Sequence, residues 1–398
     1  MQLKDIVKIQ TASINPMDVP DKLFHLYSLP SFDDNQKREE VYGRQVQSNK
    51  SLVPDKCILF NKLNVRFQRI WLINNDDKDK ICSTEFLPLI VNEAKVDFYY
   101  CYFLLHSPGI TNYLTGQNTN TSGSHKRIDP DDFLSIDVKL PSLPEQKRVG
   151  KFLYDIEQKI IVNRQINDYL AAMARQLYDY WFVQFDFPNE NGKPYKSSGG
   201  EMVWDDRLKR SIPSHWDGQS LLDVLDLFDS KRVPLSSIQR ASMKGPYPYY
   251  GATGIMDYIN DYIFDGEFIL LAEDGSTSAP DGSPIVQYIW GKNWVNNHAH
   301  IILPKDRKRI HFCFLQLKSI PAKMMETGSI QKKISQENLL KQLVVVPDKD
   351  TVSLFESIMT PLWEKKMNTT EQIIELTRQR DDLLPLLMNG QVNCQATK

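Results

Sequence analysis

Several features of secreted and membrane proteins are missing from this chain of 398 residues. Its five cysteines are scattered, and none forms a C-x-x-C pair, which argues against a disulfide framework and against a cysteine-based zinc site. No apolar run approaches the ~18 residues of a membrane span. The first residues, MQLKDIVKIQ, lack the apolar core of a signal peptide. Together these absences predict a cytoplasmic protein.

The motifs of nucleotide chemistry are also missing. There is no N-P-P-Y-like tetrapeptide, no glycine-rich cofactor loop and no G-x-x-x-x-G-K-[ST] phosphate loop. These absences disfavour a stand-alone methyltransferase and predict no ATP site and no cofactor bound by this chain. The net charge of −2 and a pI of about 6.4 argue against a stand-alone nucleic-acid binder, which is usually basic. A role with DNA would need local basic clusters or basic partners.

One long stretch contains few helix breakers. After Pro144 the next proline is Pro188, and Gly150 lies in the second turn. Apolar residues recur every seven positions, which predicts a helix of roughly 60 Å with an apolar seam that needs a partner helix. The seam residues are Val149, Ile156, Asn163, Leu170 and Leu177, with a flanking row at Phe152, Lys159, Ile166, Met173 and Tyr180.

The partner helix is predicted in the same chain. A second seam lies 206 positions later and is again apolar except at its middle residue: Phe355, Leu362, Thr369, Leu376 and Leu383. The same offset relates Lys126-Arg127-Ile128 to Lys332-Lys333-Ile334. Such a repeat indicates a duplicated unit. We therefore expect two long antiparallel helices with a pseudo-two-fold axis, and Asn163 facing Thr369 near their midpoint.

The remaining sequence predicts mixed α/β (α+β) domains. In the first half, strands are expected at 57–60, 69–73, 86–91 and 137–140, with a helix at 96–107. In the second half, strands are expected at 268–275, 285–290 and 294–303, with a helix at 312–320. The predicted organisation is a first domain (1–143), a central helix (144–184), a linker (185–218), a second domain (219–347) and a distal helix with a tail (348–398). Trp204 and Trp216 suggest that the linker is pinned down.

Two histidines form one candidate metal site. His298 and His300 are expected on one face of a strand, because side chains two residues apart share a face. A metal ion needs a third ligand, and none is evident nearby in the sequence. We therefore predict no metal, and either structural polar contacts or DNA contacts for this pair.

Polar side chains follow corresponding strands in the two halves, because ILFNKLN (58–64) aligns with ILLAEDG (269–275). Asn and Arg can read base edges bidentately, and cations hold phosphates. The predicted DNA contacts in the first half are Lys62, Asn64, Arg66, Lys126 and Arg127. Those in the second half are Glu273, Asp274, Asn296, Asn297, His298, Lys332 and Lys333.

The chain resembles a known family over essentially its whole length. LPSLPEQKRVGKFLYDIEQKI and NRQINDYLAAMARQLYDYWFVQFDFP resemble the central conserved region of the specificity subunit of type I restriction–modification systems. LPLLMNGQV resembles the distal conserved end, and LFNKLNVRF, FDGEFILLAEDGS and WVNNHAHIILP resemble the target-recognition domains. Two departures concern the repeat. The IPSHW opener of the second domain has no counterpart at the N-terminus, and L-P-x-x-E-Q is degraded to VVPDKDTV in the second copy.

The resemblance implies a non-catalytic DNA-recognition subunit. Two target-recognition domains would each read half of a split, asymmetric sequence in double-stranded DNA, and the paired helices would fix the spacer. Two methyltransferase subunits carrying S-adenosylmethionine would dock on the scaffold, and translocase–nuclease subunits using ATP and Mg²⁺ would complete a restriction complex for phage defence. Two other classes stay open: a coiled-coil assembly adaptor that does not contact DNA, and a stand-alone DNA methyltransferase.

Overall fold

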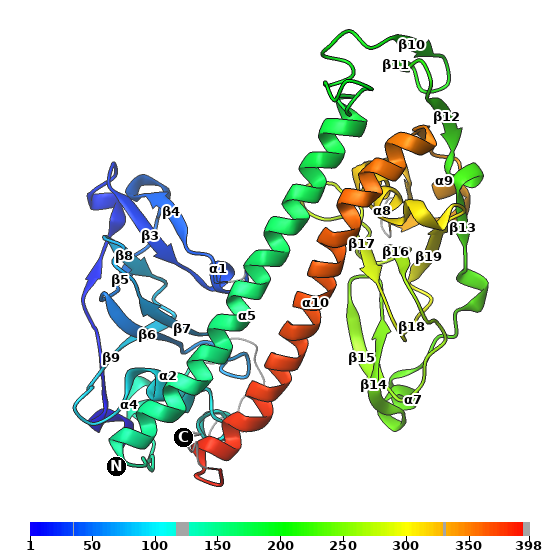
Figure 1. Ribbon diagram of the computed structural model, residues 1–398. Coiled ribbons are helices and arrows are strands. Elements are labelled where there is room, and N and C mark those ends of the chain that lie inside the picture. The colour runs from blue at the N-terminus through cyan, green and yellow to red at the C-terminus, as the bar shows by residue number, and fades with distance from the viewer. Residues whose placement is uncertain (35, 117–126, 329–331, 393–398) are drawn as a thin grey trace. The chain divides into compact units, whose positions relative to one another are not determined.

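The computed structural model describes residues 1–34, 36–116, 127–328 and 332–392 (Figure 1). The chain divides into two compact units: unit 1 comprises Met1–Arg164 with Thr370–Lys398, and unit 2 comprises Gln165–Thr369. The two long helices are α5 (Leu143–Tyr178), which continues as a π-helical turn (Asp179–Val183), and α10 (Lys349–Met388). Each long helix contributes one segment to each unit. The two predicted long helices are thus confirmed.

Unit 1 is built on an antiparallel sheet with the strand order β1-β9-β6-β7. These strands are β1 (Val7–Ile9), β6 (Lys56–Asn61), β7 (Ile70–Asn74) and β9 (Phe86–Val91). A second sheet, β2-β5-β8-β3-β4, contains β2 (Ser13–Ile14), β3 (Leu23–Tyr27), β4 (Glu39–Tyr42), β5 (Lys50–Leu52) and β8 (Lys80–Cys82). The helices are α1 (Leu29–Asp33), α2 (Phe98–His106), α3 (Pro108–Gly116) and α4 (Pro130–Leu134), with short 3-10 turns at Leu3–Asp5, Pro16–Asp18 and Gly43–Gln45.

Unit 2 contains a sheet of the same design, with the strand order β13-β19-β16-β17. Its strands are β13 (Leu225–Leu227), β16 (Phe268–Ala272), β17 (Val286–Ile289) and β19 (Ala299–Pro304). Smaller sheets are formed by β10 (Met202–Asp205) with β11 (Arg210–Pro213), β12 (Asp217–Ser220) with β22 (Leu343–Val346), β14 (Lys244–Tyr250) with β15 (Ile255–Ile259) and β18 (Trp294–Val295), and β20 (Glu326–Thr327) with β21 (Lys333–Ile334). The helices are α6 (Leu221–Val224), α7 (Ser237–Ser242), α8 (Ile310–Ser319) and α9 (Gln336–Leu340), with 3-10 turns at Asp229–Lys231, Arg307–Arg309 and Ala322–Met324.

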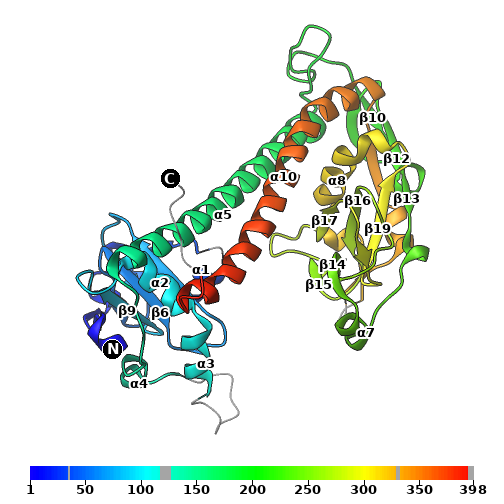
Figure 2. The same cartoon turned by 60° about the horizontal axis from the view of Figure 1, so that its bottom comes forward.

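The two units repeat one another in detail. In unit 1, α2 packs on β7 (Figure 1). In unit 2, α8 packs on β16, β17 and β19 (Figure 2). Each of these helices carries a buried cysteine at the same position, Cys101 and Cys313. Asn64 and Gly275, which the sequence alignment pairs, both have positive φ, at 51° and 75°. The predicted internal duplication is therefore confirmed in strand order, helix packing and backbone conformation.

The long helices run antiparallel, as predicted. In unit 1, Asn163 donates to Gln372 (3.1 Å) and Arg380 contacts Glu157 (2.5 Å), so rising numbers on α5 meet falling numbers on α10. In unit 2, Thr369 bonds Asn167. Each polar seam residue therefore bonds a polar residue of the other helix, and a direct pairing of Asn163 with Thr369 stays a prediction.

The seam itself differs in one respect from the heptad assignment. All ten predicted seam side chains are buried or half-buried. In the flanking row, however, Ile166 is half-buried and the other four residues are exposed: Phe152, Lys159, Met173 and Tyr180. The second inward-facing row lies one residue further along, at Leu153, Ile160, Asn167, Ala174 and Trp181. The predicted flanking row was thus displaced by one position.

Gly150 is required by close packing at the start of α5. A Cβ at this position would lie 2.5 Å from the Tyr100 nitrogen and 2.6 Å from Asp97 Oδ1. Atoms cannot approach so closely, so α5 can rest on the first turn of α2 only if residue 150 has no side chain. The glycine in the predicted helix is therefore a contact point between two helices.

Two further segments refine the sequence predictions. The strand expected at 137–140 is wrong, because this segment forms only an isolated bridge between Gln2 and Asp137. Segment 185–218, with its linker composition, belongs to unit 2, and its Phe185, Phe187 and Trp216 are buried there. Trp216 also donates to Asp348 (2.9 Å), whereas Trp204 is exposed. One of the two tryptophans thus anchors the segment.

In the described residues, no helix combines the length and apolarity of a membrane span.

Candidate nucleic-acid interface

The first candidate surface is the turn that follows β6 in unit 1. Asn61 is buried, and its side chain bonds both backbone groups of Leu63: it accepts from the nitrogen (2.9 Å) and donates to the oxygen (2.6 Å). Asn64 then takes a left-handed conformation, which asparagine tolerates better than most residues. These local bonds fix the direction in which the chain leaves the strand.

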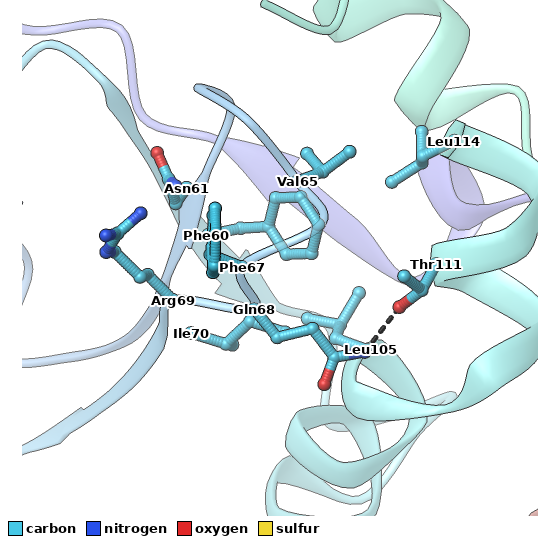
Figure 3. Close-up of a pocket in the computed structure, with 10 residues that line it drawn as sticks. All are labelled: Phe60, Asn61, Val65, Phe67, Gln68, Arg69, Ile70, Leu105, Thr111 and Leu114. Carbon is cyan, nitrogen blue, oxygen red and sulfur yellow. Dashed lines mark hydrogen bonds between the residues drawn. The ribbon is translucent and has the colours of Figure 1, made fainter. Parts of the chain in front are cut away.

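The return half of this turn is anchored to the rest of unit 1. Gln68 donates to Thr111, the hydrogen bond drawn in Figure 3, and also to the His106 oxygen (3.2 Å). Arg69 binds Asp33 through two parallel hydrogen bonds of 2.7 and 2.8 Å. The hollow beneath the turn measures about 10 Å³, enough for one water but not for a ligand. The turn is therefore a rigid support and not a binding pocket.

The tip of the turn is exposed. Arg66 faces solvent, and Phe67 is 61% exposed. The sequence alignment singled out Arg66 together with Lys62 and Asn64, both of which are half-buried here. It did not single out Phe67, because an aromatic residue in an apolar-rich stretch is normally assigned to the core. The turn thus exposes a guanidinium and an aromatic ring on two consecutive residues.

A second segment completes this surface. Arg127 forms a bridge with Leu63, and Ile128 donates to the Lys62 oxygen (2.9 Å). The Arg127 guanidinium contacts the Glu85 carboxylate at 2.7 Å, and its hydrogen bonds hold the pKa of Glu85 below its usual range. Arg127 is nonetheless exposed, so one of its faces stays available to solvent. Lys126 lies outside the described residues.

Unit 2 repeats this arrangement with different side chains. Asp274 forms a β-bridge with Lys333, as Leu63 does with Arg127. The Ile334 nitrogen donates to the Glu273 backbone oxygen (2.8 Å), as the Ile128 nitrogen does to that of Lys62. The Glu273 carboxylate lies 2.7 Å from Arg232 and 2.9 Å from Lys333. Burial alone would raise the pKa of Glu273, but these two cations lower it below its usual value. Glu273 is therefore held as a carboxylate inside an ion-pair network.

His300 and Asp229 form the buried centre of the same network. Nδ1 of His300 lies 2.6 Å from Asp229 Oδ2, and Nε2 lies 2.8 Å from the Ile334 oxygen. Asp229 also accepts from the Ile301 nitrogen (2.8 Å) and from Gln336 (2.6 Å). Burial would raise the pKa of Asp229, but the hydrogen bonds from His300, Ile301 and Gln336 hold it below its usual value. The network ties β19 to the segment that carries Lys333.

The same residues are the strongest metal-site candidate in the described chain. One ligand atom each of Asp229, Glu273 and His300 lies within 4.8 Å of the others, so the fold brings to His300 two carboxylates that are distant in the sequence. Both nitrogens of His300 already have partners, and Arg232 and Lys333 neutralise the carboxylates. An entering cation would have to displace these cations. The geometry fits an ion-pair network better than a metal site.

The remaining candidates of unit 2 lie around this network. Asn297 and His298 are exposed, whereas Asn296 is buried and its Oδ1 accepts from the His298 nitrogen (2.8 Å). His298 precedes β19 and bonds Asp274 (2.7 Å), so it does not share the buried environment of His300. Lys332 is exposed and contacts Glu326 (2.9 Å). The predicted residues gather where β16 ends and β19 begins, and DNA contact stays a prediction for each of them.

Comparisons with known proteins agree with this architecture. The type I restriction modification DNA specificity domain matches residues 1–172 and 213–378. The chain is 24% identical over 337 residues to the type I restriction enzyme MjaIX specificity subunit of Methanocaldococcus jannaschii, covering 80% of this chain and 74% of that protein. It is 21% identical over 405 residues to the HindI specificity subunit of Haemophilus influenzae, covering 84% and 86%. The crystal structure of the type I restriction-modification S subunit from M. genitalium has a TM-score of 0.62 at 13% identity, covering 97% and 95%.

A duplicated mixed α/β module on two long antiparallel helices, matched in both halves by one domain family, defines a specificity subunit. This chain belongs to the type I restriction modification DNA specificity family and is a specificity subunit of a type I restriction–modification system.

Proposed function

We propose that this subunit reads a split, asymmetric target in double-stranded DNA, with one recognition domain for each half, and that it is not itself an enzyme. The observation that carries the proposal is the repeated frame after β6 and β16. Both turns have a β-bridge and a residue with positive φ at corresponding positions. Their side chains differ, because Lys62, Leu63 and Asn64 are replaced by Glu273, Asp274 and Gly275. One frame with different side chains suits two half-sites of different sequence.

Within these frames we assign direct contacts and supporting contacts to different residues. Arg66, Asn297 and His298 are exposed, and guanidinium, amide and imidazole groups all bond base edges or phosphates. Glu273 and Asn296 are engaged by other protein groups, and we assign them to holding the surface in shape. We assign Lys62, Asn64, Arg127, Asp274, Lys332, Lys333 and the undescribed Lys126 to the surrounding contact area.

We further propose the domain limits and partners that the family resemblance implies. Residues 1–143 and 219–347 would be the recognition domains, 144–184 and 348–398 the helices with the tail, and 185–218 the connection. Two methyltransferase subunits with S-adenosylmethionine, and translocase–nuclease subunits with ATP and Mg²⁺, would assemble on this chain in the cytoplasm. Basic partners would also offset the net charge of −2, which is unfavourable for binding DNA alone.

A mobility-shift titration with the cognate methyltransferase subunits present tests this function. We expect the complex to prefer its target over scrambled DNA of equal length by roughly a thousandfold or more. A complex that assembles but binds both DNAs equally would show an assembly adaptor instead. Methylation by the purified chain alone would show a stand-alone methyltransferase, and would contradict the assignment of S-adenosylmethionine to a partner.

A further inference from the structure

Unit 2 contains a hollow that the DNA-reading role does not use. It measures about 230 Å³ and is lined by α5, α8 and α10, with Ala171, Ala172, Phe314, Lys318, Trp363 and Lys366 among its walls. Asp179, the first residue of the π-helical turn that ends α5, also lines it. π-helical turns interrupt regular helix packing and occur frequently at functional sites.

Cations dominate the charged groups of the hollow. Lys318, Lys366 and Arg175 line it together with one carboxylate, Asp179, which lies 3.7 Å from Arg175. Burial lowers the pKa of Lys318, and the nearby Arg175 lowers it further, whereas Asp281 opposes the shift. Burial likewise lowers the pKa of Lys366, with a further contribution from Lys318 and opposition from Asp168. Like charges held together in this way favour an anionic ligand.

The rest of the wall is apolar and aromatic. The Lys366 ammonium lies 5.5 Å from the centre of the Trp363 ring, and the Lys318 ammonium lies 5.6 Å from that of Phe314. A fully hydrated phosphate would leave these ring faces uncovered, whereas a carboxylate next to a large apolar side chain would satisfy both the cations and the rings.

An exposed apolar row on α5 lies beside the hollow. Tyr169 is 72% exposed, Met173 54% and Tyr180 37%. Their spacing of four and seven residues places them on one helix face, next to the lining residues Ala172 and Arg175. Exposed apolar rows bordered by charge mark protein–protein contact sites. The hollow is therefore the charged end of a larger surface suited to a protein partner.

The corresponding positions of unit 1 are different. Under the offset of 206 positions, Trp363 corresponds to Glu157 and Lys366 to Ile160. Aligning α2 with α8 at Cys101 and Cys313 pairs Lys318 with His106. Glu157 forms an ion pair with Arg380 at 2.5 Å, so this place is occupied by a closed charge pair. The duplicated helices therefore present different chemistry to their surroundings.

We propose that the hollow receives an acidic side chain, flanked by a large apolar side chain, from a methyltransferase subunit. This inference rests on the proposed function, which requires such subunits. Because unit 1 has the Glu157–Arg380 pair in the equivalent place, the contact holds one of the two methyltransferase subunits and not the other. The two subunits then bind this chain with unequal affinity.

Titration of the full-length chain with its methyltransferase subunit, followed by native mass spectrometry, tests the inference. The variants are Lys318→Gln and the double variant Lys318→Gln/Lys366→Gln, which keep most of the side-chain length and remove the charges. Lys365→Gln is the matched control, because Lys365 is the exposed neighbour of Lys366 on α10. Thermal unfolding of every variant checks that the fold is retained.

We expect the double variant to weaken one of the two binding steps by about tenfold or more, so that complexes with one methyltransferase subunit accumulate. The salt dependence of that step should fall, and Lys365→Gln should behave like the wild type. Wild-type affinity in a folded double variant overturns the inference and leaves the proposed function intact. Unchanged assembly with weaker DNA binding also overturns it, since the hollow would then hold a phosphate. Failure of the wild-type chain to assemble overturns both.

Discussion

His106, the last residue of α2, is a histidine kept neutral by its surroundings. Its Nδ1 lies 3.4 Å from Gln68 Oε1, and its Nε2 is buried with no hydrogen-bond partner among the described residues. Burial, helped by the nearby positive charge of Arg380, lowers the pKa of His106 to about 3. A proton on Nε2 would be buried without an acceptor. The free energy of unfolding therefore falls at any pH at which the unfolded chain binds a proton on this imidazole and the folded chain does not.

The His106→Gln variant tests the sign of this effect. In the unfolded chain the imidazole binds a proton below its ordinary pKa of about 6.5, whereas the folded chain binds it only near pH 3. The wild type should thus lose up to about 1.4 kcal/mol of unfolding free energy for each pH unit below 6.5 through this group. Urea unfolding at pH 7 and pH 5 should show a smaller loss for His106→Gln. Equal losses in both proteins would contradict the assignment.

Arg66 supplies the test of direct base reading. Changing Arg66 to Ala should relax recognition at one half-site only, by about 1–3 kcal/mol if the guanidinium contacts a base bidentately. Lys95→Ala, an exposed cation elsewhere in unit 1, is the control and should keep the specificity unchanged. Binding to targets mutated in one half at a time gives the measurement. Equal loss at both halves would count against two independent readers.

The sequence predicted the corresponding turns after β6 and β16 but not the contacts inside them. The alignment of 58–64 with 269–275 correctly indicated corresponding strand ends, because strands and duplicated frames leave a local pattern. The partner of Glu273 is Arg232, 41 positions away, and nothing local to either residue indicates that pairing. Burial of His300 beside Asp229 likewise depends on long-range strand register. Such contacts decide which polar side chains are engaged within the protein and which stay exposed.

At the level of the two long helices, the heptad pattern predicted one of the two inward-facing rows. The central seam followed from the seven-residue period alone, but the second row did not. Positions three and four residues after a seam residue are both possible neighbours, and each row here mixes apolar and polar residues. The structure selects the row with Leu153 and Ile160 and leaves Met173 exposed. The choice depends on the partner helix, which a single-helix pattern does not contain.

Replacing both Asn163 and Thr369 by Leu tests the polar seam. Asn163 is 1% exposed and its Oδ1 has no hydrogen-bond partner in the described structure. Removing such a group should raise the free energy of unfolding by about 1–3 kcal/mol, while the register becomes less specific. Spin labels at Lys159 and Glu375, both exposed, should then give a broader distance distribution. A lower stability with a sharp distribution would refute a register role.

At the scale of the whole molecule, the duplicated helices predict a ruler for the DNA spacer. One heptad added to each helix keeps the seam in phase and lengthens each by ~10 Å, using ~1.5 Å per residue. At ~3.4 Å per base pair the spacer should grow by about 3 base pairs while both half-sites stay the same. A heptad in one helix only should impair assembly. If segment 185–218 sets the separation of the recognition domains instead, a complex with a heptad inserted in both helices would stay active and keep the original DNA spacer.

Two different readers in one chain should define a split target. Methylome sequencing of a host that carries the cognate methyltransferase, with and without this chain, tests it most directly when a third host carries a chimaera. In the chimaera, residues 1–143 are exchanged for the first recognition domain of another family member. We predict a split, asymmetric motif that disappears without the chain and changes in only one half with the chimaera. Methylation of an uninterrupted motif, or a change in both halves, would contradict the account.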